Sequence, residues 1–154
     1  MKKILIIYFF SLLLQGCGYV PMYANNQIVD FYIEEIEFDD GDRDLSTYIK
    51  NNLNSYFISK GNQKYKIKTS IDYTKNTLSK NLAGETLEYD LIALIKFTIS
   101  TEGLTKDLII KESFKMNNFS DEFEERQYEK TIKQNMARSI TSKLLLQISR
   151  FNAS

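Results

Sequence analysis

Few side chains in this sequence could carry chemistry, and the most conspicuous of them is the single cysteine, Cys17. The 154 residues contain no histidine, which is the commonest general base and metal ligand in proteins. A lone thiol cannot form an internal disulfide, and no cysteine or histidine companion is present to complete a metal site. The acidic pairs Glu34-Glu35 and Glu124-Glu125 are adjacent in sequence and typical of solvated surface. We therefore expect no catalytic residues, no metal and no enzymatic activity.

Cys17 follows a segment with the pattern of an export signal. Lys2 and Lys3 give a positive start, and residues 4–14 form an uncharged, largely apolar run. A bilayer span needs roughly 20 apolar residues, whereas the core of a secretory signal takes about 7–15. The segment Leu14-Gln15-Gly16-Cys17 resembles the lipobox of bacterial lipoproteins. An inert thiol in a plain membrane anchor or uncleaved signal is the alternative interpretation.

The lipobox resemblance implies that residues 1–16 are a cleaved signal peptide and that Cys17 carries covalent lipid, such as palmitate. Each buried methylene contributes about 0.8 kcal/mol of membrane affinity, so several acyl chains hold a protein where one is marginal. The next residue is Gly18 rather than aspartate, which by the same resemblance favours the outer membrane of a Gram-negative cell. Apart from this lipid we expect no cofactor.

Composition limits the remaining possibilities. Without residues 1–16 the chain keeps 18 basic and 20 acidic side chains, a net charge of −2, so nucleic-acid binding has no support. The length fits one compact domain with a hydrophobic core. We expect a lipidated tether over residues 17–27 and a single α/β domain over residues 28–154.

Periodicity predicts six elements in the order strand, helix, three strands, helix. Alternation of apolar and polar residues indicates strands, and apolar residues at helical spacing indicate helices. The first strand has a change of phase at Glu34–Ile36 that suggests a bulge, and Glu102-Gly103 is expected to join the last two strands as an antiparallel hairpin. Asp42 or Asp44, and Ser120 or Asp121, are candidate helix caps. The predicted ranges are 28–38, 44–59, 65–73, 87–101, 108–116 and 121–151, with a polar connection at 75–85.

These elements predict an α+β fold, a two-layer sandwich with two helices on one face of a four-stranded, mostly antiparallel sheet. Each helix has one apolar stripe and each strand one apolar face, and two layers bury all of them. The other face of the sheet is then uncovered, and lysines outnumber acids among the residues that we place there. A solvated face is one interpretation and a contact surface for a partner or an anionic lipid is the other. The candidate contact residues are Lys66, Lys68, Lys96, Lys111, Lys115, Ile92, Leu94 and Ile109.

The residues after Cys17, in "CGYVPMY", are similar to the mature N-terminus of the LptE family of lipopolysaccharide-assembly lipoproteins, in its α-proteobacterial form. The turn Asp42-Arg43-Asp44-Leu45 and the stretch "GETLEYDLIALIKFTI" resemble the family as well, as does the order of elements. The resemblance implies an outer-membrane lipoprotein that partners and plugs an LptD-type β-barrel during lipopolysaccharide assembly. It also implies that basic residues contact lipopolysaccharide; on this chain the candidates include Lys80 besides the lysines of the uncovered face.

A different class of function stays open. Similar strand and helix layouts occur in periplasm-facing lipoproteins that serve as accessory subunits of lipid-transport ABC systems or of cell-wall synthases. The predicted domain starts about ten residues after Cys17, at most roughly 35 Å of extended chain, so the partner should lie at or in the same membrane. A structural lipoprotein without a dedicated partner is a third possibility.

Overall fold

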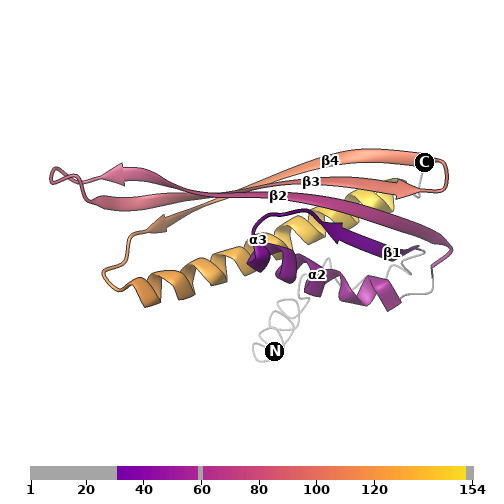
Figure 1. The fold of residues 1–154 in the computed structure, drawn as a ribbon, viewed down its shortest axis with the longest axis horizontal. Coiled ribbons are helices and arrows are strands. Elements are labelled where there is room, and N and C mark those ends of the chain that lie inside the picture. Colours follow the sequence, from indigo (N-terminus) through magenta and orange to yellow (C-terminus); the bar gives the residue numbers. More distant parts are fainter. Residues whose placement is uncertain (1–30, 59–60, 152–154) are drawn as a thin grey trace, which may run out of the picture.

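The computed structural model of the protein describes residues 31–58 and 61–151. Four strands form one sheet in the order β1-β2-β3-β4, in which β1 is parallel to β2 and the other pairs are antiparallel. Both helices lie on the same side of this sheet (Figure 1). The predicted α+β class and the element order are confirmed. The elements are β1 (Phe31–Phe38), α2 (Arg43–Ile58), β2 (Gln63–Lys80), β3 (Thr86–Thr101), β4 (Leu104–Asn117) and α3 (Glu122–Phe151).

The turn between β1 and α2 is defined by local chemistry. The register of β1 against β2 shifts between Ile33 and Glu35, which confirms the expected bulge. The backbone N–H of Leu45 donates to Asp42 Oδ1 at 2.9 Å, so Asp42 rather than Asp44 caps α2. A Cβ on Gly41 would approach the Ile71 carbonyl oxygen to 2.6 Å, so glycine allows the turn to pack directly on β2.

The hairpin of β2 and β3 is longer than the sequence predicts. Residues 75–80, expected to be part of a polar connection, continue β2, and the turn is confined to Asn81–Glu85. Gly84 in that turn has a φ of 84°. The two strands project as an arm past the start of α3 (Figure 1). Because most side chains of this part of β2 are exposed, the apolar alternation that reveals a half-buried strand is absent from it.

The core lies between the sheet and the helices. On β3 the alternating residues Leu91, Ala93, Ile95, Phe97 and Ile99 are buried, and Ile132, Met136, Ala137, Ile140, Leu144 and Ile148 of α3 face them. Asp121 Oδ1 accepts the backbone N–H of Phe123 at 2.6 Å and begins α3. Tyr128, which helical spacing from Ile132 would predict to be part of the buried stripe, is instead 41% exposed and packs on Phe119. No helix in the described part of the chain is long and apolar enough to cross a membrane.

Candidate functional site

The uncovered face of the sheet is built by the strand register, which places the candidate residues in rows across β2, β3 and β4. One row reads Asp72, Leu94, Lys111, and the next reads Ser70, Lys96, Ile109. Leu94 is 41% and Ile109 65% exposed, while Ile92 is half-buried. These three aliphatic residues, at neighbouring positions of β3 and β4, form a strip that we call the aliphatic strip.

Three of the five candidate lysines are neutralised by acids on the same face. The Nζ atom of Lys66 lies 3.7 Å from Oε2 of Glu34 and 3.5 Å from Oε2 of Glu35, across the β1–β2 pair. The Nζ atom of Lys68 lies 3.2 Å from Oε2 of Glu37 on β1, and that of Lys96 lies 2.9 Å from Oδ2 of Asp107 on β4. The expectation that lysines outnumber acids on this face is therefore wrong, because β1 and β4 supply four acids that the sequence pattern did not place there, in addition to Asp72 and Asp90.

The local environment of Asp107 shows the strength of this pairing. Its carboxylate accepts hydrogen bonds from the Lys96 ammonium at 2.9 Å and from the Thr98 hydroxyl at 2.7 Å. These donors, Lys96 first, hold the pKa of Asp107 below its ordinary value. The side chains are about half exposed, so the pairs orient one another while contributing little stability.

Lys111 and Lys115 differ from the other candidates. Within residues 31–58 and 61–151, neither has an acidic partner at ion-pair distance, and both lie on β4 at the edge of the sheet. Lysines on an edge strand also hinder pairing with the edge of another sheet. The cationic part of the uncovered face is thus two residues on β4, next to the aliphatic strip.

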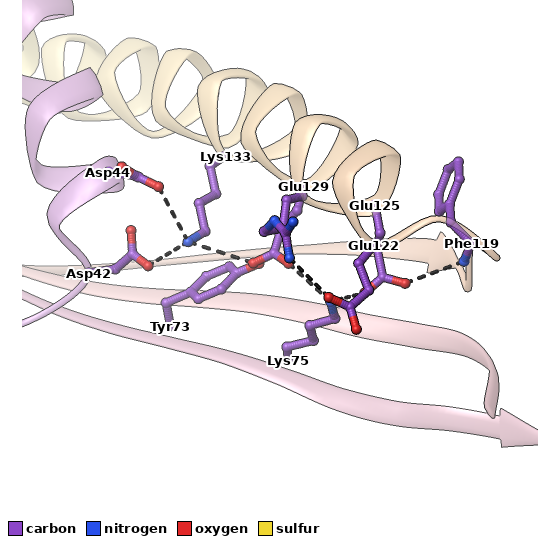
Figure 2. Close-up of polar contacts among 10 residues, drawn as sticks. Asp42, Asp44, Tyr73, Lys75, Phe119, Glu122, Glu125, Glu129 and Lys133 are labelled. Atoms are coloured by element: carbon purple, nitrogen blue, oxygen red, sulfur yellow. Dashed lines mark hydrogen bonds and ion pairs between the residues drawn. The ribbon is translucent and has the colours of Figure 1, made fainter. Parts of the chain in front are cut away.

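A second polar feature, on the helix side of the sheet, was not predicted from the sequence (Figure 2). Lys133 of α3 is only 8% exposed, and its ammonium lies 2.6 Å from Asp42 Oδ2 and 3.6 Å from Glu129. It also lies 4.0 Å from Asp44 and 4.2 Å from the centre of the Tyr73 ring. The same Asp42 caps α2, so one carboxylate joins the start of α2 to α3.

The network continues along α3 toward its N-terminus. The Tyr73 hydroxyl donates to Glu129 at 2.9 Å, and the Lys75 ammonium donates to Glu125 at 2.6 Å and to Glu129 at 3.1 Å. The second oxygen of Glu125 accepts the backbone N–H of Phe119 at 3.3 Å. We call these residues the ionic network; it links α2, β2, α3 and the loop before α3.

The pKa values in the ionic network follow from burial and pairing. Burial, and then the hydrogen bond to Glu129, raises the pKa of Tyr73 far above its ordinary value. Burial lowers the pKa of Lys75, but its hydrogen bonds to Glu125 and Glu129 outweigh burial, and the pKa is raised overall. For Glu125 burial acts upward, and the Lys75 and Phe119 donors outweigh it, so its pKa is lowered. The pKa shifts of Tyr73, Lys75 and Glu125 each favour the protonation state in which these hydrogen bonds form.

In the described part of the chain no group of three or more His, Cys, Asp or Glu side chains could hold a metal ion. The sequence did contain one signal for the ionic network: Glu129 and Lys133, four residues apart, border the apolar stripe of α3. Their partners on α2 and β2 are 91 and 56 residues away along the chain. Cys17 lies outside the described residues.

No family model matches the chain, and no curated protein sequence matches it. Solved structures share its fold. Rare lipoprotein B from Shewanella oneidensis has a TM-score of 0.59 at 12% identity, over 77% of this chain and 96% of that one. A putative lipoprotein from Caulobacter crescentus has a TM-score of 0.57 at 13% identity, over 82% and 92%. A minor lipoprotein from Acinetobacter baumannii has a TM-score of 0.55 at 17% identity, over 77% and 92%. At these identities the likeness establishes the fold, and this chain therefore has a fold that solved bacterial lipoproteins adopt.

Proposed function

We propose that this chain is an outer-membrane lipoprotein, anchored through Cys17, that partners and plugs an LptD-type β-barrel in lipopolysaccharide assembly and has no catalytic role. The observation that carries the proposal is the fold, which matches 96% of the chain of rare lipoprotein B rather than a fragment of it. The lipobox and the "CGYVPMY" segment are independent support from the sequence.

The charge arrangement supports a plug. A domain inside a water-filled lumen needs a polar surface without a large excess of one sign, and Lys66, Lys68 and Lys96 are each paired with acids on the uncovered face. The aliphatic strip beside Lys111 and Lys115 has the mixed character that suits a lipid with acyl chains and anionic groups. The ionic network ties both helices to the sheet, which suits a compact subunit.

The first experiment is purification of the tagged, full-length protein from detergent-solubilised outer membranes, followed by mass spectrometry of the proteins that accompany it. We expect a stoichiometric large β-barrel, and a Cys17→Ser variant should lose both the lipid mass on this residue and the outer-membrane fraction. Recovery of ABC-transporter or cell-wall-synthase subunits without a barrel would reject the plug and favour the accessory-subunit function.

Lipopolysaccharide contact is tested separately in the same purification. Lys111→Glu combined with Lys115→Glu should lower the amount of lipopolysaccharide recovered per protein by about tenfold, the effect of roughly 1.4 kcal/mol of lost interaction. The matched control is Lys50→Glu with Lys130→Glu, which makes the same change of charge on exposed positions of α2 and α3. An equal loss in both variants would mean that net charge, not this part of β4, determines recovery.

A further inference from the structure

A groove of about 480 Å³ separates α2 from α3 on the helix layer. Its α3 wall extends from Arg138 to Ser149, about 16 Å at 1.5 Å per residue. That length accommodates about five residues of extended chain. Leu146 in this wall is 52% exposed. The other lining residues are Phe31, Asn52, Ser55, Tyr56, Thr141, Ser142 and Leu145.

Thr141 is a buried polar residue in the wall of the groove. The residue is 4% exposed, and its Oγ1 has no hydrogen-bond partner within the described part of the chain. Buried polar atoms in folded proteins are almost always hydrogen-bonded, because leaving one unpaired costs the desolvation of that group. The backbone of a peptide segment lying in the groove would supply the missing donor or acceptor.

We propose that residues 19–30 dock in the groove between α2 and α3, with Asp30 toward Arg138. This segment comprises most of the predicted tether (17–27) and the start of the predicted first strand (28–30), and we refer to residues 19–30 as the tether from here on. The described chain begins at Phe31, which itself lines the groove and stacks on Tyr56 with ring centres 5.8 Å apart. Phe31 also pairs with Gln63, the first residue of β2. The groove, whose apolar lining is Phe31, Tyr56, Leu145 and Leu146, therefore lies next to the point where residues 19–30 join the domain.

Composition and charge of the tether suit the groove. The tether contains Tyr19, Val20, Met22 and Tyr23, apolar side chains that a purely solvated linker does not need. Its only charged residue is Asp30, and among the described residues that line the groove only Arg138 is charged. Among the described residues, the hydrogen bond that Arg138 donates is to Asn135 Oδ1, at 3.5 Å, and it has no acidic partner at ion-pair distance, so its guanidinium is available to a carboxylate.

Covalent attachment favours the tether over a second copy of the protein. A segment joined to its site by a short linker has an effective concentration in the millimolar range. A contact with a Kd of about 1 mM would then be about half occupied within one molecule, whereas a second copy would need a millimolar protein concentration. Residue 30 is joined directly to Phe31 in the groove, so residues 19–30 compete strongly with any free partner.

Docking would fix the position of the domain relative to the membrane. Fourteen residues from Cys17 to Phe31 reach up to about 50 Å when fully extended. A tether held in the groove reaches less far and leaves from the helix layer, so the helix layer would lie toward the membrane and the uncovered face of the sheet away from it. This consequence uses the lipid anchor of the proposed function, but the docking itself depends neither on the lipid nor on the barrel.

Disulfide trapping in the full-length protein tests the proposal. Ser142→Cys places a thiol in the groove, and Val20→Cys, Tyr23→Cys and Asn26→Cys, one at a time, place a thiol on the tether. The matched control is Lys143→Cys, the next residue of α3, whose native side chain turns to Glu112 of β4 at 2.6 Å. Mass spectrometry of the oxidised protein identifies each linked pair, including any link through Cys17. We expect at least one tether position to link to Ser142→Cys at fivefold or greater yield than to Lys143→Cys.

Equal yields at the two α3 positions would overturn the proposal, and so would links between molecules seen as a dimer on a non-reducing gel. The charge contact is tested by Arg138→Glu, which should lower the yield at least threefold, and by Arg138→Glu with Asp30→Arg, which should restore it. An Arg138→Glu variant with full yield would reject the contact with Asp30. A link from Ser142→Cys to Cys17 itself would support docking while contradicting the lipid anchor, so the two ideas fail separately.

Discussion

Replacement of Lys133 by methionine is the most direct test of the ionic network. Methionine keeps the length of the aliphatic stem and removes only the ammonium, which lies 2.6 Å from Asp42 and 3.6 Å from Glu129. Removing one partner of a fully buried ion pair costs about 3–5 kcal/mol, because the other charge stays desolvated and unpaired. Here both carboxylates are 18% exposed and keep other donors, the Leu45 N–H for Asp42 and Tyr73 and Lys75 for Glu129. We therefore expect Lys133→Met to lower the free energy of unfolding by about 2–3 kcal/mol.

The measurement is urea denaturation followed by circular dichroism, on the chain from Gly18 onward, which lacks both the apolar run of residues 4–14 and the lipidation site. Lys130→Met, at an exposed position of the same helix, is the matched control and should change the free energy of unfolding by less than about 0.5 kcal/mol. Asp42→Asn keeps a capping residue for α2, so the cycle with Lys133→Met isolates the charge interaction, which we expect at about 1–2 kcal/mol. A Lys133→Met protein as stable as the parent would refute the reasoning, since desolvation would then cancel the ion pairs.

Three further predictions concern the hydroxyl, the turn and the arm. Tyr73→Phe should cost about 1–2 kcal/mol, because the donor to Glu129 is lost. The pKa of Tyr73 is higher in the folded protein than in the unfolded chain, where it is near 10, so the hydroxyl contributes stability below about pH 10 and loses that contribution as the pH rises further. In urea titrations above pH 10, Tyr73→Phe should therefore lose less stability than the parent protein. Parallel stability curves for the two proteins would contradict this. Gly41→Ala should cost about 1–3 kcal/mol by urea denaturation, since its Cβ would meet the Ile71 carbonyl oxygen at 2.6 Å, and an unchanged midpoint would show that the turn can shift. Leu82→Ser should leave the thermal midpoint unchanged, because Leu82 is fully exposed at the end of the arm; a clear loss of stability would mean that the arm packs against something.

The sequence by itself determined the local elements. The alternation from Leu91 to Ile99 and the apolar stripe from Ile132 to Ile148 require one buried side each, and this requirement is visible without knowing what covers it. Caps and turns are equally local: Asp42 and Asp121 bond to backbone groups within three residues, and Gly103 adopts a φ of 83° at the predicted hairpin turn. These features sufficed for the element order and the two-layer class.

Only the tertiary structure decided which charges meet. Lys66 is paired because β1 lies parallel to β2 in one register, and strand order has no signature in the periodicity of either strand. Lys133 can be buried because partners that are distant in sequence meet at its ammonium; Asp42, for example, precedes it by 91 residues. The extension of β2 over residues 75–80 was also not predicted. Hydrogen bonds to β3 hold it extended, and because most of its side chains are exposed it lacks the apolar alternation that indicates a strand. Periodicity records burial, whereas pairing depends on distances that arise only when the layers come together.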